Sequence, residues 1–83
     1  MQKSKAPRTV PITIRALVQR INRKLAEDGE VLKAPRGARA LQELGDYYIL
    51  DINLNAVLHK DVDVEELGRE LGALKDYEHV AGE

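Results

Sequence analysis

The chain has 83 residues, of which 43% are hydrophobic and 33% charged, with a net charge of −1 and no cysteine. This composition is typical of one folded domain, and it excludes disulfides, iron–sulfur clusters, Cys-ligated zinc and thiol catalysis. The longest wholly apolar run, Tyr47 to Leu50, is too short to span a bilayer, and no apolar segment follows the first lysines as a secretory signal requires. We therefore expect a cytoplasmic protein without a membrane partner.

The charges are divided unevenly along the chain. Residues 1–40 hold ten Lys and Arg against three acidic residues, whereas residues 41–83 hold three Lys and Arg against eleven. Either the basic half contacts nucleic acid, or the two halves attract each other within a monomer or across a dimer. We favour the second interpretation, because charge halves in a sequence need not be halves in space.

The first helix is predicted over residues 14–28. Apolar residues recur at helical spacing from Ile14 to Leu25, and Thr13 is a good N-cap. Gly29 can take the positive φ that ends a helix. The preceding residues 1–11, rich in Lys, Pro and Arg, are expected to form a mobile basic tail.

Three strands are predicted, at residues 30–34, 47–52 and 56–60. The last two form a hairpin in which a three-residue connection, with Asn55 in the left-handed region, would set Leu50 opposite Leu58. The core face of the hairpin would then carry Tyr48, Leu50, Ile52, Ala56 and Leu58. The opposite face would carry Tyr47, Ile49, Asp51, Val57 and His59. Residues 36–44, a basic turn before the hairpin, are either a short helix or an irregular loop.

The second main helix is predicted over residues 64–71. Asp63 is a good N-cap, Glu66 completes the capping-box pattern, and Gly72 can end the helix. Residues 77–83 are expected to be a polar tail. The predicted fold is α+β: one domain over 12–76, with a small, mostly antiparallel three-stranded sheet and the two main helices packed on one face.

Residues able to carry catalysis or to bind a metal are few. His59, Asp61 and Asp63 alternate, but Asp63 is better explained as a helix cap, and Glu66 stands where an EF-hand loop needs glycine. The only serine is Ser4, and two histidines without cysteine leave almost no material for a nucleophilic triad. We expect no catalytic, cofactor or metal site, and therefore not an enzyme.

Protein association is the best-supported function. The second face of the hairpin is half apolar, and a patch of this kind on a small domain favours an interface with a second copy or with another protein. In the alternative, the N-terminal tail or the segment after Pro35 covers the patch within one chain. The residues of this predicted interface are Tyr47, Ile49 and Val57.

Nucleic-acid binding is the second hypothesis. The exposed side of the first helix and the basic turn after it offer side chains that contact phosphates and base edges. No helix-turn-helix spacing, RNP motif or zinc finger supports the idea, and the isoelectric point near 6.1 weakens it. The predicted contacts are Arg15, Gln19, Arg20, Asn22, Arg23, Lys24, Arg36 and Arg39.

Three segments together resemble a group of small uncharacterised proteins of Gram-negative bacteria, which often sit near plasmid, phage or genomic-island genes. They are Ile-Arg-Ala-Leu-Val-Gln-Arg-Ile-Asn-Arg-Lys-Leu at 14–25, Leu-Gly-Asp-Tyr-Tyr-Ile at 44–49 and Val-Asp-Val-Glu-Glu-Leu-Gly-Arg-Glu-Leu-Gly at 62–72. The resemblance covers most of residues 13–76. It implies no activity and no functional residues, and favours at most an accessory role on a mobile element.

Overall fold

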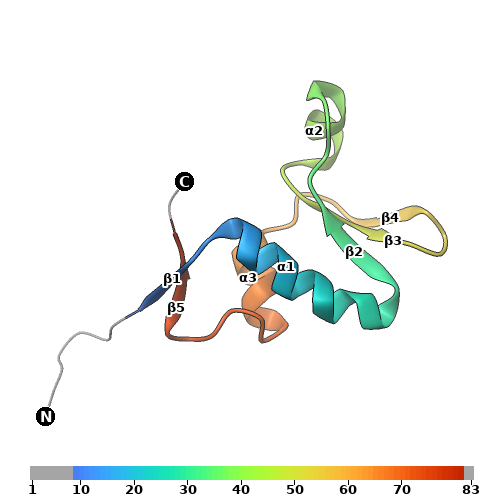
Figure 1. The fold of residues 1–83 in the computed structure, drawn as a ribbon. Coiled ribbons are helices and arrows are strands. Elements are labelled where there is room, and N and C mark those ends of the chain that lie inside the picture. The colour runs from blue at the N-terminus through green and yellow to red at the C-terminus, as the bar shows by residue number, and fades with distance from the viewer. Residues whose placement is uncertain (1–8, 82–83) are drawn as a thin grey trace, which may run out of the picture.

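A computed structural model of the chain describes residues 9–81. Strands β2, β3 and β4 form an antiparallel sheet in that order, while β1 and β5 pair as a separate parallel ribbon. This confirms the predicted α+β fold with a three-stranded antiparallel sheet. In chain order the elements are β1 (Val10–Ile12), α1 (Ile14–Leu25), the 3₁₀ turn η1 (Ala26–Asp28), β2 (Glu30–Lys33), α2 (Ala38–Leu44), β3 (Tyr48–Asp51), β4 (Ala56–His59), α3 (Val64–Glu70) and β5 (Glu78–Val80) (Figure 1).

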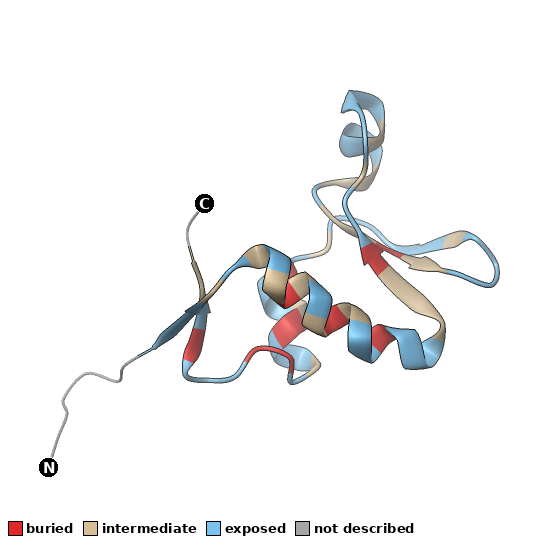
Figure 2. Cartoon of the chain, in the orientation of Figure 1, coloured by how far each residue is buried: buried red, intermediate tan, exposed pale blue. Residues whose placement is uncertain are grey.

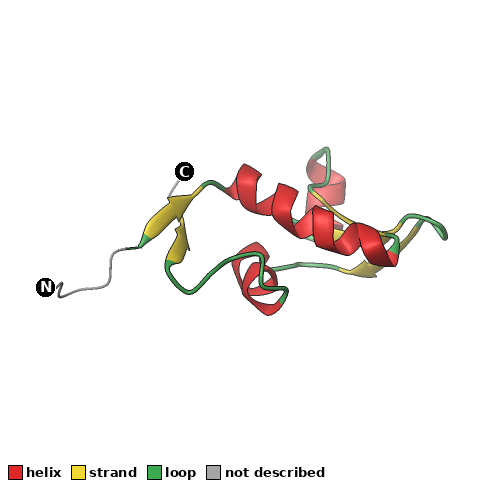
Figure 3. Cartoon of the chain, turned by 60° about the horizontal axis from the view of Figure 1, so that its bottom comes forward, coloured by secondary structure: helices red, strands yellow, loops and turns green. Residues whose placement is uncertain are grey.

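Helix α1 joins the two ends of the molecule. The ribbon of β1 and β5 lies at its N-terminal end, and the β3–β4 hairpin lies at the opposite end of the molecule (Figures 1 and 3). The Thr13 hydroxyl accepts a hydrogen bond from the Ala16 N–H at 3.1 Å, which satisfies one of the free donors of the first turn. The α-helix ends at Leu25 and tightens into η1 before Gly29, whose φ is 73°.

The core lies between α1, α3 and one face of the sheet. Leu17 and Ile21 of α1 are fully buried, and Leu32 of β2 and its register partner Ile49 of β3 close the other side. In Figure 2 the buried segments accordingly gather on α1, on β2 and in the C-terminal part of the chain. Apart from these four, the buried apolar residues are Leu25, Val64, Ala73 and Leu74.

Helix α3 crosses α1 closely at a glycine. The Asp63 carboxylate accepts from the Glu66 N–H at 3.1 Å, which confirms the predicted cap. A Cβ at position 68 would lie 2.9 Å from the Cδ1 of Leu17, a fully buried core residue. Glycine therefore stands inside this short helix because a side chain would separate it from α1, in spite of its low helix propensity.

The hairpin differs from the predicted register. Asp51 pairs with Ala56 and Leu50 with Val57, so that the turn is Ile52–Asn55, one residue longer than predicted. Asn55 does adopt the predicted left-handed conformation, with φ 54°. The register then shifts next to Leu50, where Leu58 is an extra residue on β4, in a bulge.

The predicted core face of the hairpin is therefore wrong. A shift of one residue in pairing exchanges the two faces of a strand. Ile49, predicted to lie on the outer face, is 5% exposed in the core, whereas Leu58, predicted to lie inside, is 41% exposed. Ile52 belongs to the turn rather than to β3, and it is exposed.

The ends of the chain are more ordered than predicted. Val10–Ile12 form β1 and Glu78–Val80 form β5, so the predicted tails are wrong at Val10, Pro11 and Glu78–Val80. The predicted mobility of residues 1–8 lies outside the described residues. Residues Ala38–Leu44 form helix α2, the first of the two alternatives for this segment. None of the helices within residues 9–81 has the length and apolar character needed to cross a membrane.

Candidate protein-interaction surface

Exposed apolar side chains are concentrated on the β3–β4 hairpin. Within the described residues, seven large hydrophobic side chains are exposed, and four of them lie between positions 52 and 58. Two apolar residues, Ile52 and Leu54, inside a four-residue turn are unusual, because turns favour Gly, Pro, Asn, Asp and Ser. We call the four residues the hairpin surface: Ile52 (56% exposed), Leu54 (73%), Val57 (44%) and Leu58 (41%).

A row of apolar residues extends from the hairpin surface across the sheet. Val31, Leu50 and Val57 are register partners on successive strands, so they share the face turned away from Leu32 and Ile49. Val31 and Leu50 are half-buried and Val57 is exposed. This outer face thus becomes more exposed towards β4, the last strand of the sheet.

The edge of the sheet formed by β2 is closed by a side chain. Asn22 of α1 accepts a hydrogen bond from the Leu32 N–H at 2.6 Å and donates one to the Leu32 carbonyl oxygen at 3.2 Å. The side-chain amide thus occupies the donor and the acceptor that another strand would use. An edge strand treated in this way cannot add a further strand at Leu32.

The edge formed by β4 has no such cover. Within residues 9–81, the backbone of Ala56–His59 makes no hydrogen bond beyond its ladder with β3. Every second residue of an edge strand directs its N–H and C=O outwards, where another strand can pair with them. We call this side of the sheet the open edge; it runs along the hairpin surface.

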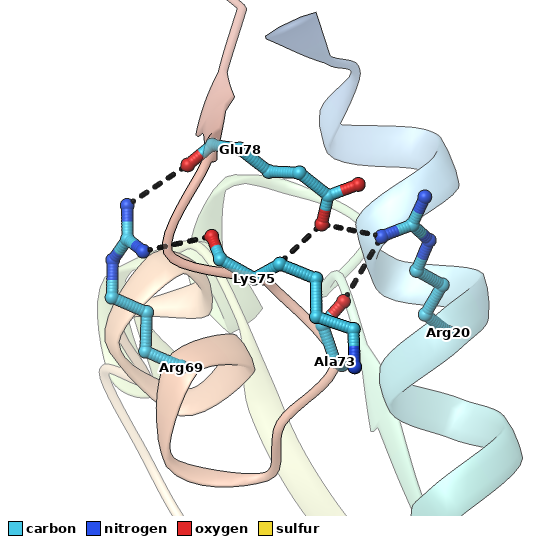
Figure 4. Close-up of polar contacts among 5 residues, drawn as sticks. All are labelled: Arg20, Arg69, Ala73, Lys75 and Glu78. Atoms are coloured by element: carbon cyan, nitrogen blue, oxygen red, sulfur yellow. Dashed lines mark hydrogen bonds and ion pairs between the residues drawn. The ribbon is translucent and has the colours of Figure 1, made fainter. Parts of the chain in front are cut away.

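A network of charged side chains anchors the C-terminal segment. The carboxylate of Glu78, a buried residue of β5, lies 2.8 Å from the Arg20 guanidinium on α1 and accepts from the Lys75 N–H at 2.9 Å (Figure 4). These contacts, the hydrogen bond from Arg20 first, lower the pKa of Glu78. Arg69 of α3 donates to the carbonyl oxygens of Lys75 and Glu78, both at 3.2 Å. The network ties β5 and the loop before it to α1 and α3.

The structure separates the three residues of the predicted interface. Val57 is exposed and belongs to the hairpin surface, but Ile49 is in the core and Tyr47 packs against the core while half-buried. Leu50 lies on the outer face in place of Ile49, and the turn, one residue longer than predicted, makes Val57 its partner on β4. The outer face does carry apolar side chains, but they are Val31, Leu50 and Val57 rather than the predicted Tyr47, Ile49 and Val57.

The predicted nucleic-acid contacts fall into two groups. Arg20 and Asn22 are engaged by Glu78 and Leu32, and Arg39 lies 3.7 Å from the Glu43 carboxylate. The structure thus places two of the eight side chains in the framework of the fold. The members that are exposed and without an ion pair among the described residues are Arg15, Gln19, Arg23, Lys24 and Arg36.

A groove of about 890 Å³ lies beside the N-terminal half of α1. Arg15 and Asp46 are the charged residues of its wall, and they offer no constellation for acid–base or nucleophilic chemistry. No three His, Asp or Glu side chains of residues 9–81 come together as metal ligands. The apolar part of the wall is formed by Ile14, Val18, Ala34, Pro35, Leu41, Tyr47 and Ala81.

Two features of the surface were not predicted from the sequence. Ile52 and Leu54 were assigned to a strand and a turn, although two apolar residues so near Asn53 and Asn55 are themselves a signal of an exposed patch. The contact of Glu78 with Arg20 joins residues 58 positions apart, and no local pattern indicates it.

No protein-family model, curated protein or solved structure matches this chain. The resemblance to small proteins of Gram-negative bacteria therefore stays a prediction.

Proposed function

We propose that this protein is a non-enzymatic module that acts by protein association through the hairpin surface, with a second copy of the chain as its partner. The observation that carries the proposal is the concentration of exposed apolar side chains on one hairpin, beside a strand edge without cover. Exposed apolar patches of this kind mark interaction sites in soluble proteins. The accessory role implied by the resemblance is compatible with such a module.

The four side chains of the hairpin surface supply the apolar centre that an interface needs. Their exposed fractions run from 41% to 73%, so burying the remaining surface of each would contribute roughly 1 kcal/mol. Specific interfaces bury about 800 Å² on each partner, with an apolar centre and a polar rim. Lys33, which shares the outer face with Val31, and Lys60, which follows β4, provide charged residues for such a rim.

Light scattering after size exclusion tests the proposal. We expect the wild-type protein to approach twice its monomer mass of 9.3 kDa as concentration rises. Leu54→Ser combined with Val57→Ser should raise the dissociation constant by at least tenfold. The matched control is Leu41→Ser on α2, because Leu41 is 47% exposed and lies outside the hairpin. A wild-type protein that stays monomeric at millimolar concentration would contradict the proposal.

One observation favours nucleic-acid binding as a second candidate. Arg15, Gln19 and Arg23 are exposed at spacings of four residues, which places them in one row along α1. A titration against duplex DNA and single-stranded RNA at low and moderate salt should then show binding that weakens as salt rises. Arg15→Gln with Arg23→Gln should reduce it, whereas Arg36→Gln should change it less. The candidate is rejected if no binding occurs even at low salt.

A further inference from the structure

The open edge and the hairpin surface belong to the same strand. Val57 and Leu58 are adjacent in β4, yet both are exposed, because the bulge at Leu58 breaks the alternation of inward and outward side chains. Pairing of another strand along β4 would therefore satisfy free backbone groups and bury apolar side chains in one step. A partner that docked only on the outer face would leave the backbone groups of β4 to water.

We propose that two copies of the chain pair antiparallel through β4, so that the sheet continues from β2-β3-β4 of one copy into β4-β3-β2 of the other. This inference rests on the proposed self-association and specifies its geometry. A strand can pair with an identical strand around a two-fold axis only in the antiparallel orientation, and two-fold dimers are the commonest oligomers. The Asn22 side chain prevents the same pairing at β2.

The outer face supports a second copy as the partner. Its apolar row runs through Val31, Leu50 and Val57 and ends at the open edge. Around a two-fold axis next to Val57, the row of one copy meets the row of the other. The two Val57 side chains would then be cross-strand neighbours, about 5 Å apart between Cβ atoms. The result is an apolar stripe across the whole dimer.

The charges of the sheet are complementary to those of an antiparallel copy. Glu30 and Asp51 are register partners at the turn end of the sheet, where two carboxylates repel each other. His59 and Lys60 stand at the other end of β4, followed by Asp61, which lies against Gly45. In the antiparallel pair, Lys60 of each copy lies beside the acidic turn end of the other. A parallel pair would instead bring like ends together.

The bulge sets the register that we expect. A bulge twists an edge strand and can discourage pairing beyond it. Pairing is therefore centred on Val57, before the bulge, rather than on His59. With this register, the Lys60 positions of the two copies are separated by about six residues of strand, or roughly 20 Å.

Single cysteines can test the pairing without background, because the chain has none. We expect Val57→Cys to form a disulfide-linked dimer rapidly under mild oxidation, and Leu58→Cys more slowly. Gln42→Cys, on exposed α2, is the control and should not cross-link. Spin labels on Lys60→Cys should give a distance between the two copies of roughly 20 Å, broadened by the label arms.

The results separate the pairing from the proposed function. A dimer in which Leu54→Cys cross-links and Val57→Cys does not would overturn β4 pairing, while self-association through the hairpin surface would stand. A monomer at millimolar concentration would overturn both. Rapid cross-linking of Val57→Cys together with the expected Lys60 distance would support both.

A second variant guards against altered folding of the cysteine proteins. Val57→Lys places like charges next to each other across the proposed axis and should weaken the dimer by at least tenfold. Gln42→Lys adds the same charge on α2 and should leave the dimer unchanged. Far-UV circular dichroism checks that both variants keep the fold. Equal dimer affinity of the two variants would contradict pairing at β4.

Discussion

The two edges of the small sheet differ: a side chain closes the β2 edge, and the β4 edge is open. At β2, the Asn22 side chain binds both backbone groups of Leu32, and α1 covers the adjoining face. At β4, the backbone has no partner beyond β3 among the described residues, and the neighbouring side chains are apolar and exposed. A protein that protected its sheet only against aggregation would protect both edges. Among the described residues, only the β2 edge is therefore closed to a further strand.

The same contrast holds between the two faces of β3. Ile49 packs into the core, whereas Leu50 lies on the outer face only partly covered. The two residues are neighbours of equal size. Substituting each of them therefore measures how much its face contributes to the free energy of unfolding. If the core face supplies most of the free energy of unfolding, the outer face remains free to bind a partner.

The largest expected effect is the difference in free energy of unfolding between substitutions at Ile49 and at Leu50. At low concentration, Ile49→Ala should lower the free energy of unfolding by about 3 kcal/mol, because it leaves a cavity in the core. Leu50→Ala should lower it by less than about 1 kcal/mol in the monomer. Urea denaturation followed by circular dichroism measures both. Similar losses for the two variants would mean that the outer face is covered within one chain.

An intermediate effect is expected where α1 closes the β2 edge. Asn22→Ala leaves the Leu32 N–H and carbonyl without partners at a buried position, and should cost about 2 kcal/mol. Arg23→Ala, at the next and exposed position, should change the free energy of unfolding by less than about 0.5 kcal/mol. If Asn22→Ala is as mild as Arg23→Ala, the Asn22 side chain does not close the edge.

The smallest effect is expected far from both edges, at the Glu78 network. The folded-state pKa of Glu78 is lowered, so its contribution is present above the pKa of the unfolded chain and is lost as pH falls through the folded value. Glu78→Gln should therefore lower the urea midpoint at pH 7, and the gap to wild type should narrow below about pH 4. Glu70→Gln, exposed on α3, is the control. A gap that does not change with pH would rule out this ionic contribution.

Local sequence signals predicted the main helices and the strands of the sheet. They could not predict contacts between residues that lie far apart in the chain. Thr13, Asp63 and the spacing of the apolar residues of α1 act within a few positions, so the two main helices and three strands were predicted correctly. The faces of the hairpin depended on whether the turn held three or four residues, which the repeated Asn53-Leu54-Asn55 pattern does not decide. The longer turn makes Val57 rather than Leu58 the partner of Leu50, and the structure places Ile49 in the core and Leu50 on the outer face.

Only part of the candidate site could be predicted from the sequence. Val57 was predicted correctly as exposed, because hairpin alternation placed it on the outer face. The closing of β2 by Asn22 was not predicted, because an asparagine on a charged helix face also suits nucleic-acid contact. Strand β5 was missed because its order depends on Arg20 and on pairing with β1, both distant in the chain.

Amide hydrogen exchange at two protein concentrations tests the contrast between the edges most directly. At low concentration, the Leu32 amide, bound to Asn22, should be protected, and the outward amides of β4 should exchange fast. At millimolar concentration, the β4 amides should slow by at least tenfold while Leu32 stays unchanged. Exchange at β4 that does not depend on concentration would contradict the account.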